Sequence, residues 1–179
     1  MNRAARIALP LYLLVIYSTL GVIRQVSNAL RDANLLRVTV ACMFAAAVVA
    51  LVVLLWRLGR LGHARTWVTL GLAGVAYAAA LWPMESPEEK VHFIEYGVVA
   101  ALAFFAAPER LQGFERHAAA AVFTLAAGWV DEGIQALLPS RYYDLRDVAF
   151  NGAAGVFALF VVAGCRWSPT RTHADRHVK

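Results

Sequence analysis

Six long apolar stretches constrain the fold of this chain more than any other feature of its sequence. Each is about 20 residues long, which is the length of helix that crosses the hydrocarbon core of a bilayer. The composition agrees, because 60% of the residues are hydrophobic and 16% are charged, whereas soluble domains carry roughly 25% charge. We therefore predict an all-α, polytopic membrane helical bundle that forms a single domain over residues 1–179. The six predicted transmembrane helices span residues 4–23, 38–57, 66–83, 87–107, 117–138 and 147–165.

The positive charges indicate how these helices are oriented. If the N-terminus is cytoplasmic, 11 of the 17 lysines and arginines fall on the cytoplasmic side, although Arg24, Arg31 and Arg37 run against this bias. Basic residues gather on the cytoplasmic side of membrane proteins, so we expect both termini there, with residues 166–179 as a basic cytoplasmic tail. The net charge of +5 does not indicate a nucleic-acid partner, because the basic residues flank the apolar stretches.

The two halves of the chain differ in their polar content. Residues 1–83 have almost no charge inside the predicted helices, and we expect them to form a lipid-facing scaffold of three helices. Residues 84–165 hold most of the polar groups and are predicted to form a polar core of the last three helices. This asymmetry argues against the internal repeats found in many secondary transporters.

The segment between the first two predicted helices is amphipathic. Ile23, Val26 and Leu30 recur at helical spacing, and polar residues such as Arg24 and Asn28 occupy the positions between them. This pattern predicts a short helix lying in the membrane interface. An ordinary polar loop explains the pattern equally well.

Three polar clusters interrupt the second half of the chain, at residues 89–96, 131–135 and 141–151. A charged side chain inside a membrane helix costs about 2.5–3.5 kcal/mol on insertion scales, so such groups need a reason to be there. The predicted topology places all three clusters near the outer face of the membrane. We interpret them as parts of one shared site.

The fourth predicted helix combines a start signal with a candidate acid–base pair. Residues 86–89 form a capping box, in which the Ser86 hydroxyl is expected to bond to a free backbone amide while Glu89 reaches back. His92 and Glu95 share one helical face. A carboxylate one turn from an imidazole orients it for proton transfer. The alternative is a hydrogen-bonded pair with a structural role only.

The second cluster places two carboxylates beside an amide. Glu132 and Gln135 share a helical face, as do Asp131 and Gln135. Adjacent residues of a helix point about 100° apart, so both carboxylates cannot easily face one partner. We expect Glu132 to enter the site and Asp131 to brace a neighbouring helix.

The third cluster forms a polar stripe if the sixth helix begins near Asp144. Asp144, Asp147 and Asn151 are then neighbours on one face. Arg141 is suited to clamping a carboxylate or phosphate through two hydrogen bonds. Arg141 or Arg146 pairing internally with these aspartates is an equally weighted alternative, and both interpretations can hold together.

Several kinds of site are not indicated. The sequence has no serine nucleophile elbow, no phosphate-binding P-loop and no zinc signature. The single histidine among the carboxylates is not at a spacing diagnostic of a metal. We therefore expect neither a metal nor a cofactor.

The polar clusters resemble the motifs of the VanZ-like family of bacterial membrane proteins over about residues 85–165. The resemblance is carried by Glu89-Lys90-Val91-His92 with Glu95-Tyr96, by Asp131-Glu132 with Gln135, by Pro139-Ser140-Arg141, and by Asp144-Leu145-Arg146-Asp147 with Asn151. The first three predicted helices carry little of the family pattern. Gly133-Ile134 stand where some relatives have a histidine, and Ala154 and Ala158 stand where many have glycine.

The resemblance implies a small multi-pass helical protein of the bacterial cytoplasmic (inner) membrane. The family takes its name from low-level resistance to glycopeptide antibiotics such as teicoplanin, which implies a role in the cell envelope. The partners that we expect are membrane lipids, together with a lipid-linked envelope intermediate or a glycopeptide.

Three functions are compatible with these residues. The first is an enzyme that acts on envelope lipids, and the second is a non-catalytic protein that binds a lipid or an antibiotic. A proton-coupled transporter is less favoured, because the charged groups gather on one side of the membrane. The candidate catalytic residues are His92, Glu95, Glu132 and Asp147. The candidate substrate-binding residues are Lys90, Tyr96, Asp131, Gln135, Arg141, Asp144 and Asn151.

Overall fold

The computed structural model describes residues 3–139 and 143–166 of the 179-residue chain. These described residues form six α-helices and no strands, which confirms the predicted all-α bundle. The helices are α1 (Arg3–Asp32), α2 (Leu36–Arg57), α3 (Ala64–Leu81), α4 (Pro87–Ala106), α5 (Gly113–Ala136) and α6 (Leu145–Arg166). The predicted tail over 166–179 lies almost wholly outside the described residues.

Four of the helices, α1, α2, α3 and α6, are long and apolar enough to cross a membrane. The outer surfaces of the first three expose large apolar side chains such as Ile7, Val49 and Leu72, as lipid-facing helices do. Helices α4 and α5 are as long but less apolar, because each contains four charged residues. The four apolar helices fit a membrane protein, in which the charged groups of α4 and α5 need shelter from lipid.

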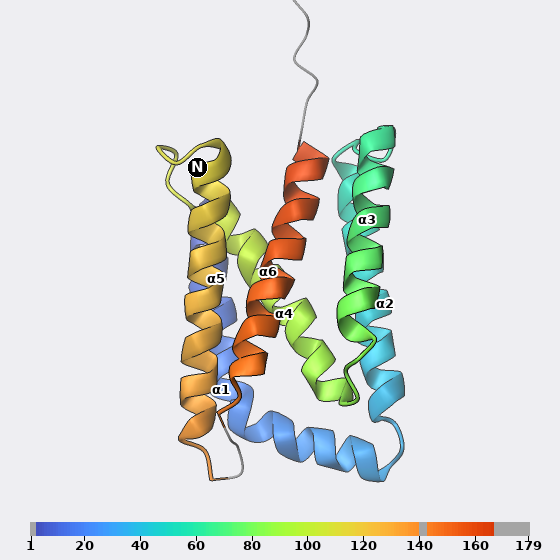
Figure 1. Ribbon diagram of the computed structural model, residues 1–179, viewed down its shortest axis with the longest axis vertical. Helices are drawn as coiled ribbons and strands as arrows, with labels where there is room; N and C mark the ends of the chain where they lie inside the picture. The colour runs from blue at the N-terminus through green and yellow to red at the C-terminus, as the bar shows by residue number, and fades with distance from the viewer. Residues whose placement is uncertain (1–2, 140–142, 167–179) are drawn as a thin grey trace, which may run out of the picture.

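That shelter comes from the packing of α4, α5 and α6 against one another. Helix α6 runs through the middle of the bundle, α4 crosses it obliquely, and α5 stands beside both (Figure 1). Helix α1 packs on α4, and α3 packs on α6. The three helices that bear the polar clusters thus form the centre of the molecule.

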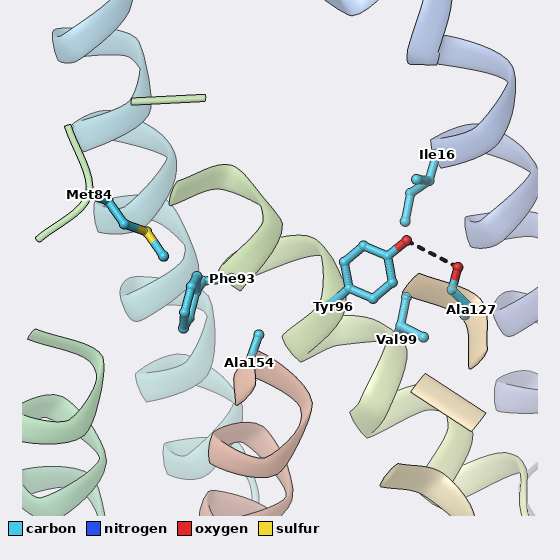
Figure 2. Close-up of a cluster of buried hydrophobic side chains, with 7 residues drawn as sticks. All are labelled: Ile16, Met84, Phe93, Tyr96, Val99, Ala127 and Ala154. Atoms are coloured by element: carbon cyan, nitrogen blue, oxygen red, sulfur yellow. Dashed lines mark hydrogen bonds between the residues drawn. The ribbon is translucent and has the colours of Figure 1, made fainter. Parts of the chain in front are cut away.

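Helix α4 is the most enclosed of the three. Its buried residues recur three and four positions apart, and they join two apolar clusters. In the first, Phe93, Tyr96 and Val99 of α4 meet Ile16 of α1 and Ala127 of α5 (Figure 2). Helix α4 contacts neighbouring helices on several sides. These contacts hold the polar groups of its first turns in place relative to α5.

The helix connections alternate between the two ends of the bundle. The segments joining α2 to α3 and α4 to α5 lie at the upper end in Figure 1, together with the N-terminal end of α1. The segments joining α1 to α2, α3 to α4 and α5 to α6 lie at the lower end. The upper end therefore holds the more basic connections, and the lower end holds the polar clusters.

Helix α1 is longer than the sequence predicts. The amphipathic segment is neither a separate short helix nor a loop, because α1 continues unbroken to Asp32. Its later part turns and runs across the lower end of the bundle (Figure 1). The hydroxyls of Ser18 and Thr19 donate hydrogen bonds to the backbone carbonyl of Val15, at 3.1 and 2.8 Å. Such bonds bend helices, which accounts for the change of direction.

The start of α4 departs from the predicted capping box. Pro87 is the first helical residue and Ser86 is the cap residue, but Ser86 makes no side-chain capping bond. Its hydroxyl instead donates to Glu88 Oε2 at 2.7 Å. Arg31 at the end of α1 forms an ion pair with the same carboxylate. A bond to a charged carboxylate is stronger than one to a neutral backbone group, so Glu88 takes the serine hydroxyl from its capping role.

Candidate functional site

The polar residues of α5 belong to its buried face. The buried positions of this helix are Ala120, Thr124, Ala127, Gly128, Asp131, Glu132 and Gln135, which recur three and four apart. This is the spacing of one helical face, and it packs against α4 and α6. Asp131 and Glu132 are fully buried, so the bundle interior rather than lipid surrounds them.

One amide joins both carboxylates of α5. Gln135 Nε2 donates to Glu132 Oε1 at 2.9 Å and to Asp131 Oδ2 at 3.2 Å. Gln135 is thus one partner that both adjacent carboxylates face, although the 100° between them makes a shared partner difficult. Positions three and four before Gln135 both lie one helical turn away, so its long side chain reaches both.

His92 of α4 lies between two carboxylates. Its Nδ1 is 3.8 Å from Glu95 Oε2 on the same helix and 3.9 Å from Asp131 Oδ2 on α5. The Asp131 side chain is fully buried, His92 is 12% exposed and Glu95 is 30% exposed. The first two polar clusters thus converge, and His92 stands at the boundary between the buried and the accessible carboxylate. We call His92, Glu95, Asp131, Glu132 and Gln135 the carboxylate cluster.

The expected division of roles between the two α5 carboxylates is reversed. Asp131, rather than Glu132, faces His92. Glu132 Oε2 accepts a hydrogen bond from the backbone N–H of Asp144 at 3.1 Å, so it braces the segment that leads into α6. The second and third polar clusters meet through this bond.

The Asp144 side chain is bound by the guanidinium of Arg146, two residues later in the chain. Its oxygens accept hydrogen bonds from the Arg146 guanidinium at 2.7–3.3 Å, and Asp144 Oδ1 also accepts from the Arg146 backbone N–H at 2.8 Å. The Arg146 side-chain bonds hold the pKa of Asp144 below its usual range. This is the internal pair that the sequence left open for Arg146. Arg141, the predicted anion clamp, lies outside the described residues.

Asn151 is buried in the contact between α6 and α5. Its side chain is fully buried, and within the described part of the chain neither amide atom has a hydrogen-bond partner. It lies against Gly128, where an added Cβ would be 2.8 Å from the Asn151 Cβ. Burying an unpaired amide costs about 1–3 kcal/mol. Asn151 is therefore the member of the third cluster whose polarity the described contacts do not explain.

Tyr96 is part of the core rather than an accessible binding group. It is fully buried, and its hydroxyl lies 3.4 Å from the backbone oxygen of Ala127 (Figure 2). Tyr17 of α1 donates to the same oxygen at 2.8 Å. The Tyr96 ring centroid is 6.2 Å from that of His92, so Tyr96 bounds the carboxylate cluster on its deep side.

The remaining predicted site residues lie at the rim. Lys90 is partly exposed in the first turns of α4, and Asp147 is partly exposed in the first turn of α6. Both helices begin at the lower end of the bundle (Figure 1). Within the described residues no three His, Cys, Asp or Glu side chains are grouped so as to hold a metal ion.

Two residues of the site, Tyr17 and Gly128, were not predicted from the sequence. Tyr17 belongs to the half predicted to be a lipid-facing scaffold, although a tyrosine hydroxyl in a membrane span is a usable signal for a polar partner. Gly128 stands one turn before Asp131 on the same face, and a small residue there signals close approach of another helix.

No protein family, curated protein or solved structure matches the chain. The resemblance to the VanZ-like family therefore stays a prediction that rests on the motifs themselves.

Proposed function

We propose that this protein carries out acid–base chemistry on the headgroup of an envelope lipid or a lipid-linked intermediate. The site is the lower end of the bundle, where α4, α5 and α6 meet. The observation that carries the proposal is the position of His92 between the buried Asp131 and the partly exposed Glu95. Histidine changes its charge near neutral pH, so it is the side chain best suited to take up and return a proton.

Each member of the cluster has a distinct role in this proposal. Asp131, held by Gln135, orients the imidazole from the buried side. Glu95 faces the accessible side, where a headgroup hydroxyl or phosphate can approach His92. Glu132 is a positioning residue, because it holds the backbone at Asp144 and so keeps the start of α6 beside the cluster.

A lipid headgroup is the substrate class that fits the location. The apolar outer surfaces of α1–α3 support a position in a membrane, and the cluster lies in the first turns of α4 and the last turns of α5, close to one end of the bundle. Headgroups occupy the polar layer at that depth. The VanZ-like motifs extend the proposal to a bacterial cytoplasmic membrane and to a link with glycopeptide susceptibility, and the distribution of basic residues favours both termini inside.

A second candidate function is recognition of a lipid or glycopeptide without conversion. It is favoured by the bonds among Asp131, Glu132, Gln135 and the Asp144 amide, which can lock α5 to α6 without any chemistry. In that case His92, Glu95 and Lys90 contribute only contacts to a bound headgroup.

Mass spectrometry of lipids distinguishes the two functions. Purified protein in nanodiscs would be incubated with bacterial envelope lipids, with His92→Gln and Asp131→Asn beside the unchanged protein. Glu89→Gln, a partly exposed carboxylate on the same helix, is the matched control. Conversion of a lipid that the control retains and both cluster variants lose supports the enzyme. Enrichment of an intact lipid favours recognition, and conversion by all variants alike would refute the assigned roles.

A further inference from the structure

A cavity with basic side chains in its lining lies at the opposite end of the bundle from the carboxylate cluster. Its volume is about 650 Å³, and it lies between the end of α4, the start of α5 and the last turns of α6. Among the described residues that line it, three are basic, Arg65, Arg116 and His117, and one is acidic, the exposed Glu109. The volume is within the range of small-ligand sites, roughly 300–1,000 Å³.

Arg116 is held in place at this cavity. Its Nη2 donates to the backbone oxygen of Ala107 at 2.8 Å, and its guanidinium carbon lies 5.5 Å from the centroid of the Phe104 ring. Its Nε is buried and, within residues 3–139 and 143–166, has no hydrogen-bond partner. A guanidinium that is already fixed loses little conformational freedom when it binds an anion.

His117 is held in the same way, one turn into α5. Its Nδ1 lies 2.8 Å from the backbone oxygen of Gly113, and its ring centroid is 4.6 Å from that of Phe104. A carbonyl oxygen only accepts hydrogen bonds, so Nδ1 is the donor, and Nε2 donates to an anion when the ring carries both protons. The described part of the chain supplies no hydrogen-bond partner for the buried Nε2.

The backbone adds to the positive character of the cavity. Gln112 and Gly113, where α5 begins, are part of its lining, and no side chain caps this helix start. The first amides of a helix are free to bind anions, and the helix dipole favours negative charge there. The lining also includes apolar side chains, among them Phe104 and Val162, which suit the hydrocarbon part of an amphiphile.

We propose that this cavity binds a phosphate group, with Arg116 and the doubly protonated ring of His117 as its side-chain donors and the start of α5 as its backbone donor. An anionic phospholipid of the adjacent leaflet and a soluble phosphate ester are the two sources of that chemistry. The site is independent of the carboxylate cluster, since it lies at the other end of the bundle (Figure 1).

Removing positive or negative side chains from the cavity lining is expected to change lipid retention in opposite directions. Full-length protein would be studied in nanodiscs of phosphatidylcholine with a minority of phosphatidylglycerol, and retained lipid would be counted by native mass spectrometry. We expect His117→Gln and Arg116→Gln to weaken retention of phosphatidylglycerol about tenfold, as loss of a charge-assisted bond does. Glu109→Gln removes the opposing carboxylate and is expected to strengthen it.

Arg110→Gln is the matched control, because Arg110 is an exposed arginine in the same connection that is outside the cavity lining. We expect it to change retention less than twofold. If Arg116→Gln does not fold, His117→Gln and Glu109→Gln still test the proposal through their opposite effects. An equal loss in Arg110→Gln, or no effect of Glu109→Gln and His117→Gln, would overturn it.

Titration calorimetry with inorganic phosphate in phosphatidylcholine nanodiscs identifies the source of the phosphate. Heat of binding that Arg116→Gln and His117→Gln abolish indicates a soluble phosphate compound. Selective retention of phosphatidylglycerol without phosphate binding indicates the lipid. Absence of both in the unchanged protein would refute the phosphate site.

Discussion

Asn151 of α6 packs directly on Gly128 of α5, where a Cβ on residue 128 would lie 2.8 Å from the Asn151 Cβ and 3.0 Å from its Nδ2. The contact is one helical turn from Asp131 and Glu132 on the same face of α5. It therefore sets the separation of α5 and α6 close to the carboxylate cluster.

Gly128→Ala is expected to destabilise the protein by about 1–3 kcal/mol, because the added methyl group forces a tightly packed contact apart. Gly133→Ala on the same helix is the matched control, since nothing lies within 4 Å of a Cβ added there. In that exposed position alanine is expected to stabilise the helix by up to about 1 kcal/mol. Unfolding of both variants in detergent measures the difference, and equal stabilities would contradict the Asn151 contact.

We expect removal of the two buried side-chain amides, those of Gln135 and Asn151, to lower the free energy of unfolding by different amounts. Gln135→Ala leaves Asp131 and Glu132 without their shared donor, and we expect a loss of about 3 kcal/mol or more. Asn151→Ala removes an amide whose burial is itself unfavourable, which offsets the lost packing, so we expect a loss below about 1 kcal/mol. Unfolding free energies of the two variants check this order. Similar losses would mean that Asn151 has an important partner in the folded protein.

The Asp144–Arg146 pair predicts a small dependence of stability on pH. The pKa of Asp144 is lowered in the folded state by the Arg146 side chain. The pair therefore contributes fully above the unfolded carboxyl pKa of about 3.9, and its contribution is lost as the pH falls through the lower folded pKa. We expect Asp144→Asn to flatten the loss of thermal stability in this acidic range, with Arg146→Gln producing the same change. Unaltered acid sensitivity in both variants would exclude the pair as its source.

The ion pair between Arg31 and Glu88 predicts an energetic link between the end of α1 and the start of α4. Their side chains are 59% and 27% exposed, so we expect a coupling of only about 0.2–1 kcal/mol. A double-mutant cycle with Arg31→Gln and Glu88→Gln measures it. The coupling should shrink in high salt, because exposed charges are screened. A coupling that salt leaves unchanged would indicate a contact other than the ion pair.

Local relationships in the chain were predictable from the sequence. The lengths of the apolar stretches predict the number of helices and the approximate bounds of all except α1, because a membrane helix must be long and apolar wherever it lies in the bundle. The approach of His92 to Glu95 follows from their i, i+3 spacing. The Arg146 bond to Asp144 is equally local, since only one residue separates them.

Relationships between helices were decided only by the tertiary structure. Asp131, and not Glu132, faces His92 because the packing of α5 on α4 and α6 fixes how far α5 is rotated about its axis. The packing of α1 against α5 likewise brings the Tyr17 hydroxyl to the backbone oxygen of Ala127. The sequence by itself determined which residues share a helical face. Which face meets which neighbour depends on how side chains such as Gly128 and Asn151 fit together across two helices, and no periodicity within one helix contains that information.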